Sequence, residues 1–236
     1  MYSYWDGVSR QINELLYSRT ERPLGKNWEE WAAIWCNWLL SMPKQGHPNF
    51  DLTGHNCDKN QEYHGVWFLP GSFGNIEPIH RHCKIPRGRS ILFSIVEKED
   101  SFAEDTDLIN ESQLKDSACG FISKITNIEA SIDCVQIKNL QEYRVQSDYF
   151  HLKFPEDPIY DVEPGVTTAV SVGYWLFIKP LTVGNHEIQF GATVALKSDD
   201  EVTKQMKKDN TYLPIRDHIE GNNLFELNVN YHITIV

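Results

Sequence analysis

The sequence predicts a mainly β protein, an antiparallel β-sandwich of jelly-roll type with Trp-rich N-terminal helices packed on it. Three observations predict this class. Short segments rich in β-branched and aromatic residues follow one another from residue 65 onward, and most are bounded by Gly, Pro or Asp. No long helical pattern separates the later segments. The last segment alternates as a half-solvated antiparallel strand does, with apolar positions at Leu227, Val229, Tyr231, Ile233 and Ile235.

These signals place the strands individually. The expected strands cover residues 65–69, 81–85, 90–96, 129–137, 149–154, 167–172, 174–180, 184–190 and 224–236. The stretch GYWLFIKPLTVGNHEIQF contains a hairpin, because Pro180 ends one strand and the Val183–Gly184–Asn185 run supplies the turn before the next.

Residues 1–43 form the expected N-terminal helical segment. From residue 27 to 40, four Trp residues recur at intervals of three or four, which puts their indoles on one helical face; they are Trp28, Trp31, Trp35 and Trp38. Asn27 takes the N-cap position, and Pro43 follows the end of the helix. The stripe suits a helix that covers a sheet better than an exposed platform for sugars or lipid. A second amphipathic helix is expected over residues 4–17.

The chain is expected to form a single domain over residues 1–236, since β-sandwiches of this size are commonly one unit. Two polar stretches interrupt the strand pattern, an acidic one at 97–117 and a charged one at 195–223. Both are predicted to be surface excursions, and long loops of this kind often carry binding residues.

Charge and hydropathy exclude several classes of partner. The chain has 33 acidic and 22 basic residues and a formal net charge of −11, which opposes binding to phosphate backbones, so nucleic acid is not an expected partner. No stretch approaches the roughly 18 apolar residues of a membrane span. The first ten residues lack the features of a signal peptide. We therefore expect either a cytoplasmic protein or a processed secreted form.

Several sequence motifs resemble those of a known family. The stretch NFDLTGHNCDKNQEYHGVWFLPGSFG (49–74) follows the Trp-rich helix and precedes RHCKIPRGRSILFSIV (81–96). Together with PLTVGNHEIQF, these words resemble a family of uncharacterised bacterial and archaeal proteins with the motifs WxxWxxS-P, NPxxDxTGxxC and VWFLxGxFG. The resemblance implies a β-sandwich with no established activity. This chain differs from the family at the NPxxD motif, where it reads His47–Pro48–Asn49–Phe50–Asp51.

The five cysteines show no CxxC spacing, and their odd number leaves at least one free if the others pair within the chain. Cys57 and Cys83 flank the Val-Trp-Phe-Leu strand from either side. They could therefore form a disulfide across neighbouring strands in an oxidising compartment.

Aromatic and amide side chains are dense between residues 49 and 73, a composition that suits carbohydrate recognition by ring stacking and hydrogen bonds to hydroxyl groups. The candidate ligand-binding residues are Trp67, Phe68, Asn60 and Gln61. Trp67 and Phe68 cannot share one face of a strand, so at least one is available to solvent, a ligand or another layer. The same composition also suits a buried turn network beneath a core.

His80 and His82 are the candidate metal ligands, for one divalent metal ion. Histidines two apart on a strand point to the same face and can share an ion. The pair resembles the first half of the cupin metal motif, but Pro86 and Arg87 stand where that motif places its Glu.

The sequence has no GxSxG elbow of a covalent hydrolase, and neither the GxxxxGK[ST] motif nor a GxGxxG motif after a strand that would indicate nucleotide binding. The sequence therefore favours a non-enzymatic binding or assembly protein, with a carbohydrate or a protein as partner and self-association as a further possibility. The alternative is a cupin-like, metal-dependent enzyme that uses His80 and His82.

Overall fold

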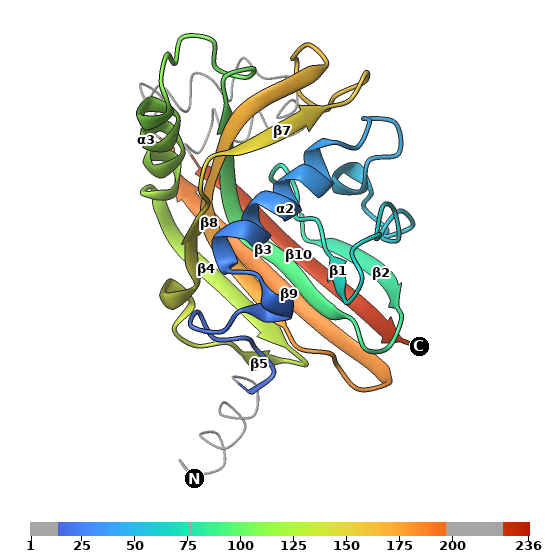
Figure 1. Ribbon diagram of the computed structural model, residues 1–236. Coiled ribbons are helices and arrows are strands. Elements are labelled where there is room, and N and C mark those ends of the chain that lie inside the picture. Colours follow the sequence, from blue (N-terminus) through green and yellow to red (C-terminus); the bar gives the residue numbers. More distant parts are fainter. Residues whose placement is uncertain (1–13, 76, 197–223) are drawn as a thin grey trace.

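In the part of the chain that the structure describes, the fold consists of two β-sheets and two α-helices (Figure 1). The computed structural model describes residues 14–75, 77–196 and 224–236. In the first sheet the strand order is β1-β3-β8-β6, and β7 also pairs with β8. The bounds of its strands are β1 Val66–Phe68, β3 Ser90–Ser101, β6 Arg144–Gln146, β7 Phe150–Phe154 and β8 Gly165–Ile178.

The second sheet has the order β2-β10-β9-β4-β5. Its strands are β2 Ile79–Ile85, β4 Ile125–Ile132, β5 Val135–Gln136, β9 Gly184–Ala195 and β10 Leu224–Ile235. The predicted mainly β fold with an N-terminal helix is confirmed. The pairing is mixed rather than wholly antiparallel, because β1 pairs with β3 and β2 with β10 in parallel. Long connections separate the members of each parallel pair, so a tight turn does not dictate their direction.

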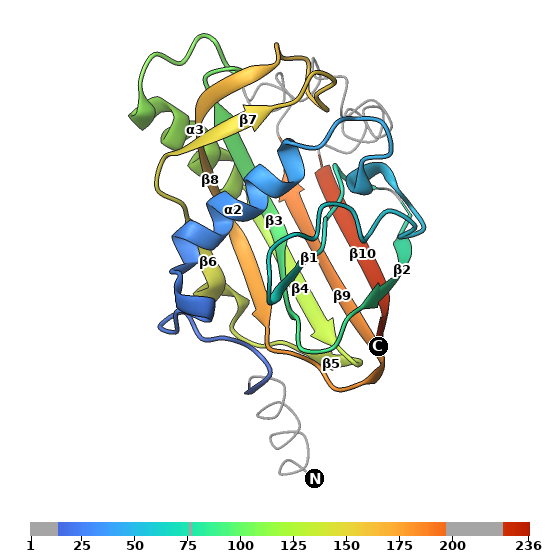
Figure 2. The same ribbon diagram turned by 45° about the vertical axis from the view of Figure 1, so that its right-hand side comes forward.

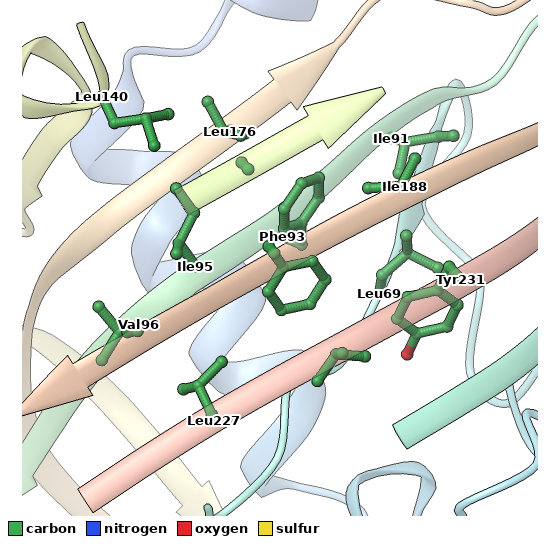
Figure 3. Packing of buried hydrophobic residues seen from close by; sticks show 14 of the residues in the cluster. Leu69, Ile91, Phe93, Ile95, Val96, Leu140, Leu176, Ile188, Leu227 and Tyr231 are labelled. Carbon is green, nitrogen blue, oxygen red and sulfur yellow. The ribbon is translucent and has the colours of Figure 1, made fainter. Parts of the chain in front are cut away.

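The main hydrophobic core lies between the two sheets (Figure 3). Phe93 of β3 stacks on Phe190 of β9 at 4.6 Å between ring centres, and Phe190 stacks in turn on Tyr231 of β10 at 6.3 Å. Helix α3 (Glu111–Ile122) contributes Leu114 and Phe121 to this core. Three short 3-10 helices complete the described elements: η1 Pro23–Gly25, η2 Pro48–Phe50 and η3 Leu140–Tyr143.

Helix α2 (Trp28–Leu40) covers the outer face of the first sheet (Figure 2). Its predicted N-cap is confirmed, since the Asn27 side chain accepts a hydrogen bond from Glu30 N while the Glu30 carboxylate accepts one from Asn27 N. All four Trp side chains of the stripe are buried. Burial of roughly 200 Å² per indole contributes about 5 kcal/mol each before the loss of chain entropy is subtracted.

This arrangement leaves the two sheets differently exposed. The first sheet is covered on both faces, so β3 is buried without interruption from Ser90 to Val96. The second sheet meets the core on one face only, and β2 accordingly alternates buried and exposed residues along its length. The outer face of the second sheet is therefore polar and faces solvent.

Several segments differ from the expectation. Predicted strands 167–172 and 174–180 are one continuous strand, β8. The predicted hairpin between this strand and 184–190 is wrong, because β8 and β9 belong to different sheets. Strand β3 extends to Ser101, so the acidic excursion expected from residue 97 begins later, and Glu99 and Asp100 are buried. A β-bulge between Ser94 and Val96 resets which side chains of β3 face α2.

The predicted helix over 4–17 lies mostly outside the described residues. At its described end, Leu16 bridges to Ile178, and Tyr17 N donates to Phe177 O, so the chain there pairs with β8. The charged insertion at 195–223 lies almost entirely outside the described residues. Within the described ranges, no helix is long and apolar enough to cross a membrane.

Candidate functional site

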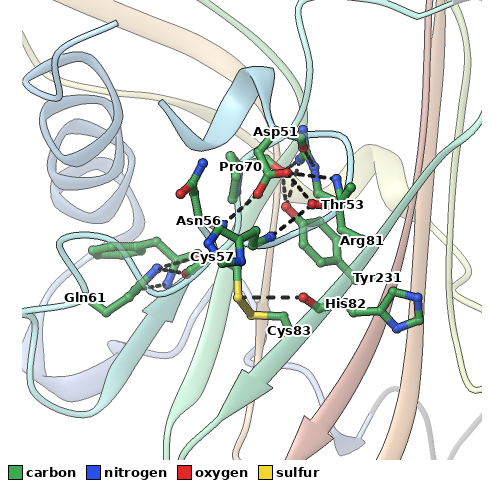
Figure 4. Close-up of a disulfide and its surroundings, with 12 residues drawn as sticks. Asp51, Thr53, Asn56, Cys57, Gln61, Pro70, Arg81, His82, Cys83 and Tyr231 are labelled. Carbon is green, nitrogen blue, oxygen red and sulfur yellow. Dashed lines mark hydrogen bonds between the residues drawn. A yellow bond between two sulfur atoms is a disulfide. The ribbon is translucent and has the colours of Figure 1, made fainter. Parts of the chain in front are cut away.

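Arg81 anchors the loop that carries the DxTGxxC motif (Figure 4). Its side chain faces inward from β2 and is 1% exposed. Its hydrogen-bond acceptors, at 2.7–3.0 Å, are the carbonyl oxygens of Asn49, Asp51, Pro70 and Gly71 and the hydroxyl oxygen of Tyr231. No carboxylate pairs with this guanidinium among the residues that the structure describes. Backbone dipoles therefore compensate the buried charge, and the Tyr231 ring adds a cation–π contact at 5.5 Å.

Asp51 shapes the same loop. Its carboxylate accepts hydrogen bonds from Thr53 N, Thr53 Oγ1 and Asn56 N at 2.7–2.9 Å, which makes an Asx turn. Burial raises the pKa of this carboxyl, but the hydrogen bonds outweigh it and hold the pKa below its usual range. Gly54, at φ +85°, packs against the backbone of His82 where no side chain would fit. The motif thus fastens the loop across the edge of β2.

A disulfide joins Cys57 of this loop to Cys83 of β2, with Cα atoms 6.0 Å apart (Figure 4). Thr53 O also accepts a hydrogen bond from His82 N at 2.8 Å. The open edge of β2 is therefore covered by its own chain instead of remaining free to pair with another strand.

The candidate carbohydrate residues occupy structural positions. Trp67 points into the core between the sheets and Phe68 into the cluster beneath α2, so both rings are buried and neither forms an exposed platform. Gln61 bridges the backbone of Phe68 and the Cys57 carbonyl by hydrogen bonds of 2.9–3.0 Å. Asn60 is exposed in a left-handed conformation, φ 52°, in the turn before Gln61. The first sheet is covered by α2 on one face and by the second sheet on the other.

A polar groove of about 1110 Å³ crosses the outer face of the second sheet. β2, β10 and β9 form its floor, and the Gly54–Asp58 loop and the β4–β5 turn also line it. Polar residues that line it include Asp58, His82, Lys84, Asn185, Glu187 and His232. Groups of both charge signs and neutral hydrogen-bonding groups therefore face one concave surface.

Three imidazoles form a row along the floor of this face. His232 of β10 stacks on His82 at 4.8 Å and on His80 at 5.8 Å between ring centres. The two β2 histidines share one face of their strand as expected, and this is the outer face of the sheet. The third member comes from a strand about 150 residues further along the chain, which pairs with β2 in parallel. Sequence reasoning missed His232, although its place at a polar position of the alternating last strand was a usable signal.

Hydrogen bonds fix the acidic side of the groove. Asp133 and Cys134 form the two-residue turn between β4 and β5, with φ of 49° and 63°. In this position the Asp133 carboxylate accepts a hydrogen bond from Glu187 N and lies 2.8 Å from His186 Nδ1. Hydrogen bonding from Asn230 is the largest cause that lowers the pKa of Glu187. Hydrogen bonds therefore hold the carboxylates of Asp133 and Glu187 in fixed positions at the groove, where they can accept hydrogen bonds from a ligand.

No three His, Cys, Asp or Glu side chains within the described ranges are placed to hold a metal ion together. The predicted metal ligands His80 and His82 share a face with His232, as stacked rings and not as a convergent ligand set. A metal site at this row would require the imidazole rings to rotate out of their stack, and elemental analysis of the purified protein tests for bound metal.

A second polar cluster lies beneath α2. Burial raises the pKa of Glu97 to about 7, against the opposing effect of a 2.9 Å hydrogen bond from Ser171 Oγ. Burial raises the pKa of Glu99 further, and the carboxyl of Glu104 beside it acts in the same direction. Burial raises the pKa of Glu104 as well. Each of these carboxyls therefore keeps its proton to a higher pH in the folded protein than in the unfolded chain.

Replacement of Glu97 by Gln is expected to stabilise the protein at alkaline pH. The folded state keeps a proton on Glu97 that the unfolded chain releases above its pKa of 4.5, so stability falls as pH rises through the window from 4.5 to about 7. Because Gln mimics the protonated form, the variant should gain up to about 3 kcal/mol over the wild type at pH 8 and roughly 1 kcal/mol or less at pH 5. Urea unfolding at both pH values measures this difference, with the exposed Glu142→Gln as the matched control. An equal gain at pH 5 and pH 8 would contradict the assignment.

Comparison with known proteins adds little to this geometry. No family model and no curated protein matches the chain. Among solved structures, a cysteine protease inhibitor from Entamoeba histolytica aligns at 15% identity with a TM-score of 0.22, covering 72% of this chain and 96% of that one. Amebosin aligns at 8% identity with a TM-score of 0.19, covering 72% and 97%. Likenesses this weak assign no function, so the functional argument depends on this chain's own residues.

Proposed function

We propose that this protein is a non-enzymatic binding protein that takes a carbohydrate in the polar groove on the outer face of the second sheet. The observation that carries the proposal is the groove itself, about 1110 Å³ in volume and lined by hydrogen-bonding side chains on adjacent strands. Ligand sites of drug-sized molecules usually occupy about 300–1,000 Å³. The groove therefore suits an extended ligand that contacts several strands at once.

The chemistry of the lining favours a ligand rich in hydroxyl groups. A hydroxyl both donates and accepts a hydrogen bond, and the groove offers the acceptors Asp133 and Glu187 beside the donor Lys84. The imidazoles of His82 and His232 add planar rings with polar edges. Carboxylates and a cation lie in the same groove, so a strongly charged ligand of either sign would meet repulsion somewhere along it.

His232→Ala is expected to weaken carbohydrate binding at least about 10-fold, because the ring lies at the centre of the groove floor and a lost ligand contact of about 1.4 kcal/mol has this effect. A glycan array would identify the ligand, and titration calorimetry would then compare the variant with the wild type. Gln136→Ala, an exposed change on β5 outside the groove, is the control and should bind normally. Equal affinity of the His232 variant for a glycan that the wild type binds would place the site elsewhere.

The same sample tests the alternatives. A wild-type protein that binds no glycan but forms a complex or an oligomer in solution, measured by light scattering, would replace the carbohydrate with a protein partner. Near-stoichiometric zinc, iron, copper or manganese that is lost in a His80→Ala, His82→Ala double variant would instead support the metal-dependent alternative.

A further inference from the structure

A second, smaller cavity lies between α2, β3 and the loop that follows β1. Its volume is about 50 Å³, and its lining includes Trp35, Asn49, Phe73, Glu97, Glu99 and Tyr160. A single water needs only about 10–15 Å³ of such space, so the cavity can hold a small polar group with the carbons attached to it. Phe73 and Tyr160 are half-buried, with ring centres 6.0 Å apart, and form its outer wall.

Glu99 makes this cavity unusual. Its side chain is buried, with the residue 2% exposed. Its oxygens meet no fixed donor among the described residues, and their polar neighbour is the Glu104 carboxyl, with which Glu99 can share one proton. The side-chain oxygen of Asn49, which lines the same cavity, is buried without a partner among those residues. An unsatisfied buried polar group typically costs about 1–3 kcal/mol, so the Asn49 oxygen calls for a donor that the described residues do not supply. The Glu99 and Glu104 carboxyls have only a proton to share between them, and a cationic donor can replace that proton.

The surroundings select the kind of donor. An anion would be repelled by whichever of the Glu97 and Glu99 carboxyls is ionised, and a neutral apolar group would leave the Asn49 oxygen unsatisfied. The ammonium of Lys98 is engaged with Asp100 at 2.8 Å. The aromatic rings in the cavity wall attract cations through their negative faces. A cationic group with several N–H donors meets all of these requirements.

From this geometry we propose that the cavity binds the ammonium group of a primary amine, with Glu99 as its main acceptor and Asn49 as a second. The aromatic rings of Trp35, Phe73 and Tyr160 surround the carbons next to the nitrogen. The remainder of the ligand extends beyond the cavity, since about 50 Å³ has no room for it. The amine is either a free small molecule or the side chain of a lysine on a protein, and both offer the same ammonium group.

Binding of a cation here is linked to release of protons. Among the described residues, Glu97, Asp100, Glu104 and the cation Lys98 lie around Glu99, and the Cys36 thiol of α2 lies close to Glu97. Burial raises the pKa of Glu97 to about 7 and that of Glu99 as well, so an arriving ammonium ion favours their ionised forms and displaces protons. Affinity for the amine should therefore increase as pH rises from 6 to 8.

The test is titration calorimetry of the full chain with n-butylammonium chloride at pH 6 and pH 8, with n-butanol as the neutral probe of similar shape. Butylammonium is expected to bind at least 10-fold more tightly at pH 8, and butanol should give no signal. Glu99→Gln, which retains the shape and removes the charge, should weaken butylammonium binding at least 10-fold at pH 8. Circular dichroism would show that this variant is folded, and the exposed Glu142→Gln is the matched control.

Three outcomes would overturn the proposal. They are absence of butylammonium binding at both pH values, equal binding of butanol, and unchanged binding in Glu99→Gln. A lysine-containing peptide that binds more tightly than butylammonium would identify a protein as the source of the amine, and the reverse order a free amine. His232→Ala should leave this binding unchanged, so the result is independent of the groove.

Discussion

Replacement of Arg81 by methionine is expected to lower the free energy of unfolding by roughly 3–5 kcal/mol. Methionine keeps an unbranched side chain but removes every donor, and so leaves the carbonyl oxygens of Asn49, Asp51, Pro70 and Gly71 without the hydrogen bonds that Arg81 supplies. The loop that these carbonyls hold should then detach from β2. Urea unfolding followed by far-UV circular dichroism measures the loss.

Two variants control this experiment. Lys84→Met makes the same kind of change three residues further along β2, on the exposed face, and should alter stability by no more than about 0.5 kcal/mol. Arg81→Lys keeps the charge but loses the planar fork of donors, and its stability should lie between those of the wild type and Arg81→Met. If Arg81→Met unfolded with the same midpoint as Lys84→Met, the hydrogen bonds of Arg81 would contribute nothing net to the fold.

Removal of the disulfide in a Cys57→Ser, Cys83→Ser double variant is expected to cost about 2–4 kcal/mol. The bond joins residues 26 apart in sequence and restricts the unfolded chain, and it holds the DxTGxxC loop against the edge strand β2. Both sulfur atoms belong to residues that line the groove, so carbohydrate affinity should fall together with stability. Thermal unfolding with and without reductant, compared with the variant, measures the first effect.

The control for this change is Cys134→Ser, because Cys134 is an exposed free cysteine in the β4–β5 turn. It should unfold as the wild type does and should still respond to reductant. Thiol titration of the unfolded wild type should find three free cysteines: Cys36, Cys119 and Cys134. Five free thiols in protein purified under oxidising conditions would show that the bond does not form.

Local sequence determined those features whose causes lie within a few residues. The helix from Trp28 to Leu40 depends on an N-cap at Asn27 and on a Trp stripe that repeats with the period of a helix, and both are visible in the chain. The last strand follows equally from its two-residue alternation. The exposed positions of His80 and His82 belong to the same class, because alternation along β2 places them on one face.

Features that depend on distant strands became visible only in the tertiary structure. Trp67 and Phe68 were candidate ligand-binding residues, of which at least one was expected to face solvent, a ligand or another layer. In the structure α2 covers one face of their sheet and the second sheet the other, so both rings are buried. Glu99 belongs to a stretch that composition marks as a solvated loop, and continuation of β3 beneath α2 buries it. Arg81 takes an inward-facing position of β2, where its neighbours on that face are apolar. The alternation of β2 thus indicated that Arg81 is buried, but it did not indicate which carbonyl groups Arg81 binds.

The groove is the clearest case. Its histidines come from β2 and β10, which lie side by side because a parallel pairing joins segments about 150 residues apart. The register of such a pair depends on the packing of the whole core and on the loop that covers the edge of β2, and no local pattern encodes it. The sequence by itself therefore determined the strands, the helix and the faces of their side chains, whereas the tertiary structure decided which of those faces meet to form a site.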